Sequence, residues 1–364
     1  MKRYKRCLAG GLCAFLLLGM VGCGDVPRPE YPDYPDYDPS DYVELGDYDQ
    51  LTVRASLIDE NPTDEEVTEK MEEGLRPQKV EDENATIAEG SYVVIDYTGT
   101  VDGESFPGSE MTDYTVHIGS GTLISGLEDA MVGMKAGEEK ELKISFPEDY
   151  SVEEVAGKVA DFTVTVKEIQ EIPEITDAVV SEQTAYDSVE AYRKAATKEL
   201  QKEKQSNNEN TKRSAILTSL PAVATVKEIP EDLRDWYVDC DVLNYTYYAK
   251  QADMDLDDYL SEQTDGEIED EDAFREYLAN NATASLSNEL ILLAIAQDQG
   301  MKISDQAYQK ALEADYETYS FDSPEEFERC YGKRAIKTML LTEKALDYFL
   351  EHVTVENVSA PAQE

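Results

Sequence analysis

The stretch Tyr92-Val93-Val94-Ile95-Asp96-Tyr97-Thr98-Gly99 decides the fold, because its run of β-branched and aromatic residues is typical of a β-strand. Asp102-Gly103 follows it as a hairpin turn signal. Hydrophobic and polar residues alternate in three later segments, which predicts half-buried antiparallel strands at 114–118, 142–146 and 162–166. Residues 126–134 predict one short helix. We therefore expect a small, mostly β domain over residues 89–171.

Toward the C-terminus the hydrophobic pattern acquires a helical period. Asp187 and Glu190 form a capping-box pattern, and the helix that they open extends as a long arm toward residue 220. Further helices are predicted to start at Pro230, to cover 274–299, and to start after the caps Ser304 and Ser323. Residues on such apolar stripes more often belong to a core than to a ligand site. The polar residues in the middle of the long helices favour arms with exposed inner faces. We expect a helical domain over residues 172–357.

On the other side of the β domain, Thr63 is a predicted helix N-cap, with Glu66 at the third helical position. Residues 23–50 hold five of the fourteen prolines and many aspartates. We expect them to form an extended acidic tether that cannot build a core, and a Tyr/Asp-rich binding motif is the alternative. Residues 51–88 are predicted to form a strand and a helix, and residues 358–364 a tail.

Residues 1–22 have the features of an export signal, with a basic start and an apolar stretch too short to span a membrane. Met20-Val21-Gly22-Cys23 resembles a bacterial lipobox, which predicts cleavage before Cys23 and lipid on its thiol. Two or more acyl chains would anchor the chain stably. A plain signal peptide or an uncleaved anchor is the alternative. The other cysteines outside this segment, Cys240 and Cys330, could form a disulfide outside the cytoplasm.

The composition limits which classes of function are possible. The 364 residues include 79 acidic and 32 basic residues, a formal net charge of −47, so nucleic acid and anionic lipid would repel the chain. The two histidines, His117 and His352, leave little room for histidine-based triads or metal sites. Asp253, Asp255 and Asp257 resemble the start of a calcium loop, but glycine and glutamate are missing from its later positions. We expect neither a metal ion nor a cofactor.

Several motifs follow one another within the β domain in a recognisable order. They are Ile95-Asp96-Tyr97-Thr98-Gly99, Leu123-Ile124-Ser125-Gly126-Leu127-Glu128, Gly133-Met134-Lys135-Ala136-Gly137-Glu138 and Phe146-Pro147-Glu148-Asp149-Tyr150. Together they resemble the FKBP-type peptidyl-prolyl isomerase domain, most closely the version found in trigger factor. The later helix order resembles the trigger-factor C-terminal domain. The resemblance implies an α+β fold: a curved antiparallel sheet around a short helix, inserted into an all-α domain with long helical arms.

The same resemblance implies where the site lies. The positions that match the lining of the family's apolar cleft are Tyr97, Phe106, Tyr114, Leu123, Ile124, Leu127, Tyr150 and Phe162. Two positions depart from the FKBP pattern: Pro107 stands where many members have aspartate, and Leu127 stands at the floor where they have tryptophan. Trigger factors commonly have phenylalanine at that floor. We expect Leu127 to weaken turnover by reducing the aromatic surface.

These residue types suit the reaction. Rotation about an Xaa-Pro bond faces a barrier of roughly 18–20 kcal/mol that amide resonance sets. The twisted amide is less charge-separated than the planar one, so an apolar site that excludes water favours the twisted state by differential binding. Such a site needs neither an acid nor a base. The alternative is a holdase chaperone whose isomerase domain has degenerated.

The resemblance and the export signal together imply which partners the protein binds and where it works. Residues 51–88 would pack with the helical domain, and too few residues lie between Cys23 and Leu45 for the family's ribosome-binding domain. We expect a foldase, lipid-anchored to the outer face of the bacterial cytoplasmic membrane. Its partners would be unfolded or partly folded exported polypeptides that contain Xaa-Pro, and neither ribosomes nor nucleic acid. A surface adhesion lipoprotein is a further alternative.

Overall fold

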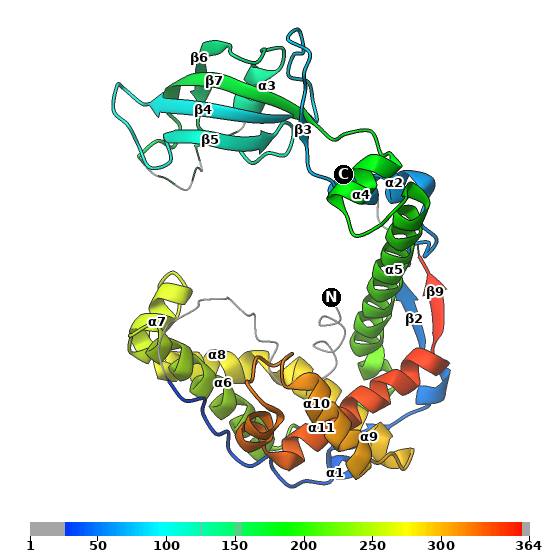
Figure 1. Cartoon of the computed structure of the whole chain (residues 1–364). Helices are drawn as coiled ribbons and strands as arrows, with labels where there is room; N and C mark the ends of the chain where they lie inside the picture. Colours follow the sequence, from blue (N-terminus) through cyan, green and yellow to red (C-terminus); the bar gives the residue numbers. More distant parts are fainter. Residues whose placement is uncertain (1–25, 125, 149, 151, 153, 359–364) are drawn as a thin grey trace. The chain divides into compact units, whose positions relative to one another are not determined.

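A computed structural model describes residues 26–124, 126–148, 150, 152 and 154–358 of the chain (Figure 1). The chain divides into two compact units. The β unit is Asn61–Lys202, and the helical unit combines Met1–Glu60 with Glu203–Glu364. The proposed signal segment, Cys23 and most of the predicted tail lie outside the described residues.

The β unit is built on a five-stranded antiparallel sheet. Its strands are β3 (Gln78–Lys79), β4 (Tyr92–Thr100), β5 (Glu110–His117), β6 (Glu139–Ser145) and β7 (Val159–Glu171). Their order is β3-β7-β4-β5, and β6 also pairs with β7. Register shifts in β4 beside Ile95 are the kind of irregularity that bends a sheet. The strands predicted from the alternating segments are present, and so is their antiparallel pairing.

Helix α3 (Leu127–Met131) lies against this sheet, as Figure 1 shows. Met131 on α3 packs in one buried cluster with Ile95 on β4 and Val164 on β7, and all three side chains are fully buried. Gly126 starts the helix in the left-handed region, with φ of 86°, which favours glycine. The predicted short helix is therefore confirmed.

A second small core in the β unit joins a segment that precedes the main strands of the sheet in the sequence to segments that follow them. Helix α2 (Asp64–Glu73) packs against α4 (Asp177–Gln183) and the first part of α5 (Val189–Ser219). The Tyr192 hydroxyl on α5 donates a hydrogen bond to the Met71 carbonyl at 2.9 Å. Helix α2 begins with the predicted capping box between Thr63 and Glu66. The predicted long arm is confirmed as α5, which has 31 residues.

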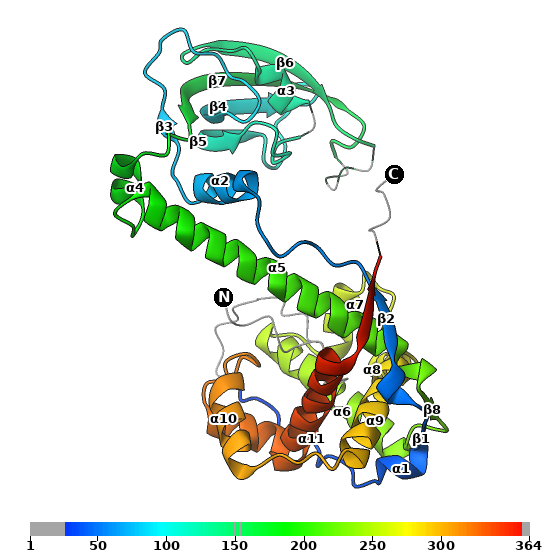
Figure 2. The same ribbon diagram turned by 90° about the vertical axis from the view of Figure 1, so that its right-hand side faces the viewer.

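The helical unit contains the remaining helices and two short sheets. The helices are α1 (Pro39–Tyr42), α6 (Glu231–Gln251), α7 (Leu256–Gln263), α8 (Glu271–Asn281), α9 (Thr283–Asp298), α10 (Asp305–Asp315) and α11 (Pro324–His352). Strand β1 (Val43–Leu45) pairs antiparallel with β8 (Ala224–Val226). Strand β2 (Thr52–Ala55) pairs parallel with β9 (Thr354–Asn357), which Figure 2 shows side by side. The core centres on α9, whose residues 289–296 form a continuous buried run.

The structure changes two details of the predicted helices. The predicted helix over 274–299 is two helices, α8 and α9, which meet at Ala282. Helix α11 starts at its predicted Ser323 cap but is kinked at Gly332, whose φ is 77°. Cys240 and Cys330 are buried free thiols, so the structure does not contain the disulfide between them. Among the helices described, none combines the length and apolar character that crossing a membrane requires.

The segment expected to be an extended tether differs most from the prediction. Its described part packs on the helical unit, where Tyr34 is 6% exposed and belongs to the main core cluster. The Trp236 indole donates to the Pro32 carbonyl at 2.7 Å, and the Tyr31 backbone amide donates to the Cys330 carbonyl at 2.9 Å. The prediction that this segment joins no core is wrong because its tyrosines supply the apolar area that its acidic residues and prolines lack.

Candidate functional site

The predicted site residues meet on one part of the β unit. Tyr97 on β4 lies between Tyr114 on β5 and Phe162 on β7, with ring centroids 6.3 Å and 6.1 Å away. Both pairs are edge-to-face, the geometry that aromatic quadrupoles favour. Tyr97 and Phe162 are 65 positions apart in the sequence. Antiparallel pairing of β4 with β5 and β7 brings the three rings together, because adjacent strands align their side chains across the sheet.

The aromatic set continues through a residue that the sequence analysis did not assign to the site. Phe106 lies 6.2 Å from Phe162 and 5.4 Å from Phe146, and Phe146 lies 4.7 Å from Tyr150 between ring centroids. Phe146 is buried and links Tyr150 to the rest of the set. Its position at the end of the alternating segment 142–146 was the sequence signal that could have identified it. We call the eight predicted residues and Phe146 the aromatic cluster.

Exposure varies systematically across the aromatic cluster. Leu127 and Phe162 are 1% and 4% exposed and form its base. The half-buried members pack on that base; they are Tyr97, Phe106, Tyr114, Leu123 and Ile124. Tyr150 is 37% exposed at the edge. The structure thus brings all eight predicted residues together as an apolar surface with a buried base and an accessible rim.

Gly99 is required at the base of the aromatic cluster. It pairs directly with Phe162 across β4 and β7. A Cβ atom at position 99 would lie 2.6 Å from Cε1 of Phe162, a separation that forces the ring to move. Glycine therefore allows the Phe162 ring to lie across the neighbouring strand, a close approach for which strand glycines are often used.

Glu128 holds the loop that carries Leu123 and Ile124. Its carboxylate is buried and accepts hydrogen bonds from the backbone amides of Gly119 at 2.8 Å, Leu123 at 2.9 Å and Gly121 at 3.2 Å. Burial opposes ionisation, but the backbone donors outweigh it and lower the pKa of Glu128 below its usual value. The ionised side chain fixes the loop without facing the aromatic cluster with an unpaired charge.

The polar atoms of the cluster are phenols. The Tyr97 hydroxyl donates to the Gly108 carbonyl at 3.2 Å. Burial raises the pKa of Tyr97 above its ordinary value, so the phenol is neutral at physiological pH. Pro107 stands beside Phe106, where many FKBP domains have a carboxylate, so this position adds no charge either. The cluster can therefore exclude water from an amide but offers no group suited to proton transfer or nucleophilic attack.

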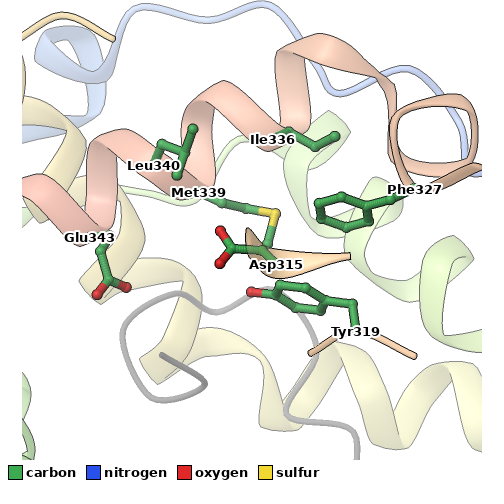
Figure 3. Close-up of a pocket in the computed structure, with 7 residues that line it drawn as sticks. All are labelled: Asp315, Tyr319, Phe327, Ile336, Met339, Leu340 and Glu343. Carbon is green, nitrogen blue, oxygen red and sulfur yellow. The ribbon is translucent and has the colours of Figure 1, made fainter. Parts of the chain in front are cut away.

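A second candidate lies within the helical unit. Figure 3 shows a small pocket whose apolar side is formed by Phe327, Ile336, Met339 and Leu340, and whose polar side is formed by Asp315, Tyr319 and Glu343. Its apolar wall and polar edge suit an apolar side chain that has a polar end. Over the described part of the chain, His, Cys, Asp and Glu side chains do not gather into a potential metal site.

Known proteins similar to this chain are trigger factors. The one from Staphylococcus carnosus (strain TM300) is 32% identical over 328 residues, covering 88% of this chain and 73% of that protein. The one from Halothermothrix orenii (strain H 168) is 30% identical over 316 residues, covering 85% and 72%. The chain belongs to the trigger factor family. A solved structure titled for promiscuous substrate recognition by the trigger factor chaperone is also similar, at a TM-score of 0.45 and 18% identity over 85% of this chain and 72% of that one.

Two family models match separate parts of the chain. Residues 83–167 match the FKBP-type peptidyl-prolyl cis-trans isomerase, and residues 188–351 match the bacterial trigger factor C-terminus. The aromatic cluster lies entirely within the first match. This trigger factor family member is therefore an FKBP-type peptidyl-prolyl isomerase joined to a trigger factor C-terminal domain, in a family of folding chaperones.

Proposed function

We propose that this protein catalyses Xaa-Pro isomerisation at its aromatic cluster and holds partly folded exported polypeptides on its helical unit. We further propose that it works outside the cytoplasm, attached to the outer face of the bacterial cytoplasmic membrane by lipid on Cys23. The observation that carries the catalytic part is the cluster itself: a buried base, a half-buried aromatic rim and neutral phenols.

The geometry suggests a division of labour within the cluster. Leu127 and Phe162 at the base form an apolar floor for the proline ring. The rim tyrosines Tyr97, Tyr114 and Tyr150 cover the amide and displace water from it. Because the planar amide loses more by desolvation than the twisted one, this surface lowers the barrier by binding the twisted state more strongly. The cluster supplies shape and low polarity, and the reaction transfers no proton to or from the substrate.

The helical unit supports the holding role. Its surface includes the pocket beside Phe327 and the exposed aromatic side chain Tyr277, which is 53% exposed. The large negative charge of the chain keeps such surfaces soluble and disfavours contact with acidic partners. It therefore favours basic or neutral client segments over strongly acidic ones, except where basic side chains line the surface.

The proposed location is supported by sequence features. The basic start, the short apolar stretch and the lipobox-like Met20-Val21-Gly22-Cys23 all point to export and lipidation. The negative charge is also unsuited to binding ribosomal RNA. Labelling cells with a radioactive fatty acid tests this directly: the wild-type chain should carry label and sediment with membranes, and Cys23→Ser should do neither. If the wild-type protein carried no label and stayed in the cytoplasm, the proposed location would be wrong, but the catalytic proposal would stand.

A proline-limited refolding assay tests the catalytic proposal. The protein beginning at Gly24 should accelerate the slow phase, which unaided takes tens to hundreds of seconds. Tyr97→Ala should lose most of that acceleration. Tyr92→Ala is the matched control, because Tyr92 lies on the same strand β4 but stacks on His117 rather than on the cluster, with ring centroids 4.3 Å apart. Equal losses in both variants would show that the cluster is not the site.

A further inference from the structure

Residues 26–38, which we call the strap, lie along the helical unit against α6, α9 and α11, where Figure 1 shows them in blue. Tyr34 is the central anchor. Its ring meets Trp236 of α6 edge-on, with centroids 5.0 Å apart, and its hydroxyl donates to the carboxyl group of Glu289 on α9. Tyr31 packs on Tyr331 of α11 at 4.6 Å. The strap thus packs against all three helices, and we call the surface that it covers the groove.

The groove contacts the strap in the way that domains contact proline-rich peptides. The Trp236 indole donates to the Pro32 carbonyl at 2.7 Å, and a proline follows each of the anchors Tyr31 and Tyr34. Proline-rich segments keep an extended backbone with unpaired carbonyls, so a groove of aromatic rings and side-chain donors can bind them at low entropic cost. These contacts depend on tyrosine, proline and an extended backbone rather than on one particular sequence.

Arginines line the rim of this groove. Arg329 pairs with Glu30 at 2.8 Å, Arg334 pairs with Asp36, and Arg28 of the strap lies 4.6 Å over the Phe321 ring. Basic residues are scarce in this chain, yet two arginines of α11 face the acidic strap. Exposed ion pairs contribute little affinity, so the rim orients an acidic peptide while the aromatic anchors hold it.

One buried group in the groove is only half satisfied. Asn244 on α6 is 5% exposed, and its Oδ1 accepts a hydrogen bond from the Tyr31 hydroxyl. Within the described structure, its Nδ2 is a buried donor that lacks a hydrogen-bond partner. Leaving such a donor unpaired is unfavourable. A peptide that supplies a hydroxyl to Oδ1, as Tyr31 does, and also places a carbonyl oxygen at Nδ2 would satisfy both ends of the amide, so the strap is not the best possible occupant of the groove.

We propose that the groove between α6, α9 and α11 binds extended segments of client chains that contain tyrosine and proline, and that the strap is its resident occupant until a client displaces it. This inference rests on the proposed function in that the clients are unfolded polypeptides. Because the strap is covalently attached, it competes at a high effective concentration. Only segments that bind better than the strap, or that are locally concentrated, would enter the groove.

The test uses the full mature chain without lipid and a fluorescein-labelled peptide with the sequence of residues 26–38. Tyr31→Ser combined with Tyr34→Ser should release the strap. The released chain should then bind the peptide at least about tenfold more tightly than wild type, because the intramolecular competitor is gone. Asp33→Ser is the matched control: Asp33 is exposed in the same strap, and its variant should bind the peptide as weakly as wild type does.

Trp236 provides an independent readout, because it is the only tryptophan in the chain. Its emission should shift to longer wavelength when the strap is released and return when the peptide is added. If the double variant fails to fold, Arg329→Ala combined with Arg334→Ala loosens the strap from the rim and should give the same shift in smaller degree. A folded released chain with unchanged Trp236 emission, or with no gain in peptide binding, would overturn the proposal.

Client competition completes the test. Reduced, carboxymethylated α-lactalbumin and a peptide of repeated Tyr-Pro-Asp triplets should both displace the labelled peptide. A peptide of repeated Ser-Pro-Asp triplets should not. If the labelled peptide binds but neither competitor displaces it, the groove serves the strap alone and the proposal fails. Phe162→Ala should bind all of them normally, so a failure of the groove can be distinguished from a failure of the isomerase site.

Discussion

The aromatic cluster of the β unit and the groove of the helical unit both present aromatic rings suited to a proline-containing chain, yet they differ in how they are filled. The cluster has an accessible rim, and its polar atoms are neutral phenols. The groove holds the chain's own strap around a buried carboxyl group, Glu289. A site for rapid turnover benefits from being open and free of charge. A site that must hold and then release a chain can instead use a resident occupant and an ionisable group.

The cluster side of this comparison should give the largest effect. Phe162→Ala removes a buried ring that contacts Tyr97 and Phe106, so we expect a loss of about 3–5 kcal/mol in the stability of the β unit. Isomerase activity should fall at least about tenfold, because the floor for the proline ring is lost. Refolding kinetics and thermal melts measure the two effects. Phe162→Leu keeps the burial, and if it retains full activity then the aromatic ring itself is not needed.

The groove side should show a pH dependence that the cluster lacks. Burial raises the pKa of Glu289 to about 7, although the Tyr34 hydroxyl partly offsets this. The folded state therefore binds the proton more tightly than the unfolded chain, where the pKa is near 4.5. The associated stability is fully present below about pH 4.5 and is lost as pH rises through about 7, a change of roughly 2–4 kcal/mol. The neighbouring phenols do not titrate in this window, because burial raises the pKa values of Tyr34 and Tyr37 further above 10.

Denaturant unfolding followed by Trp236 fluorescence at pH 5.5 and pH 8 measures this dependence locally. Glu289→Gln should remove most of it while preserving the hydrogen bond to Tyr34. Self-repulsion in a chain of net charge −47 also grows with pH, so the difference between the two proteins is the quantity to compare. Parallel losses in wild type and variant would show that Glu289 does not titrate in this range.

A smaller effect should separate positioning from contact within the cluster. Glu128→Gln keeps the shape of the side chain but replaces an anionic acceptor of three backbone amides. We expect the free energy of unfolding of the β unit to fall by about 1–3 kcal/mol, since charge-assisted hydrogen bonds are stronger than neutral ones. KM should rise more than kcat falls, because Leu123 and Ile124 become less well placed. A pure kcat effect in a tetrapeptide isomerase assay would mean that Glu128 acts on the reaction more directly.

The same comparison explains what the sequence could and could not predict. The strands that carry Tyr97, Tyr114 and Phe162 follow one another with clear alternation, so their pairing and the shared surface are predictable from local pattern. The role of Gly99 depends on a ring in a neighbouring strand, a packing contact that strand pattern alone does not indicate.

The groove was not predictable in this way. Its contacts join residues more than 200 positions apart, such as Tyr34 with Glu289 and Pro32 with Trp236. The proline-rich, acidic composition correctly indicates an extended segment, but composition does not say what lies against it. The junction of α8 and α9 at Ala282 was missed for a related reason, because neither glycine nor proline marks it.

The smallest expected effect concerns Leu127, where this chain departs from the phenylalanine common in trigger factors. Leu127→Phe should raise kcat/KM a few-fold by extending the aromatic floor, at a cost of about 1–3 kcal/mol because the site is already fully packed. Met131→Phe is the matched control, since Met131 is equally buried on the same helix α3 but is not among the residues predicted to line the site. A gain in both variants would reflect general loosening of the domain. A gain in Leu127→Phe alone would show that position 127 faces the substrate and sets the rate there, whereas no gain would place Leu127 in the core and leave Phe162 as the sole floor of the site.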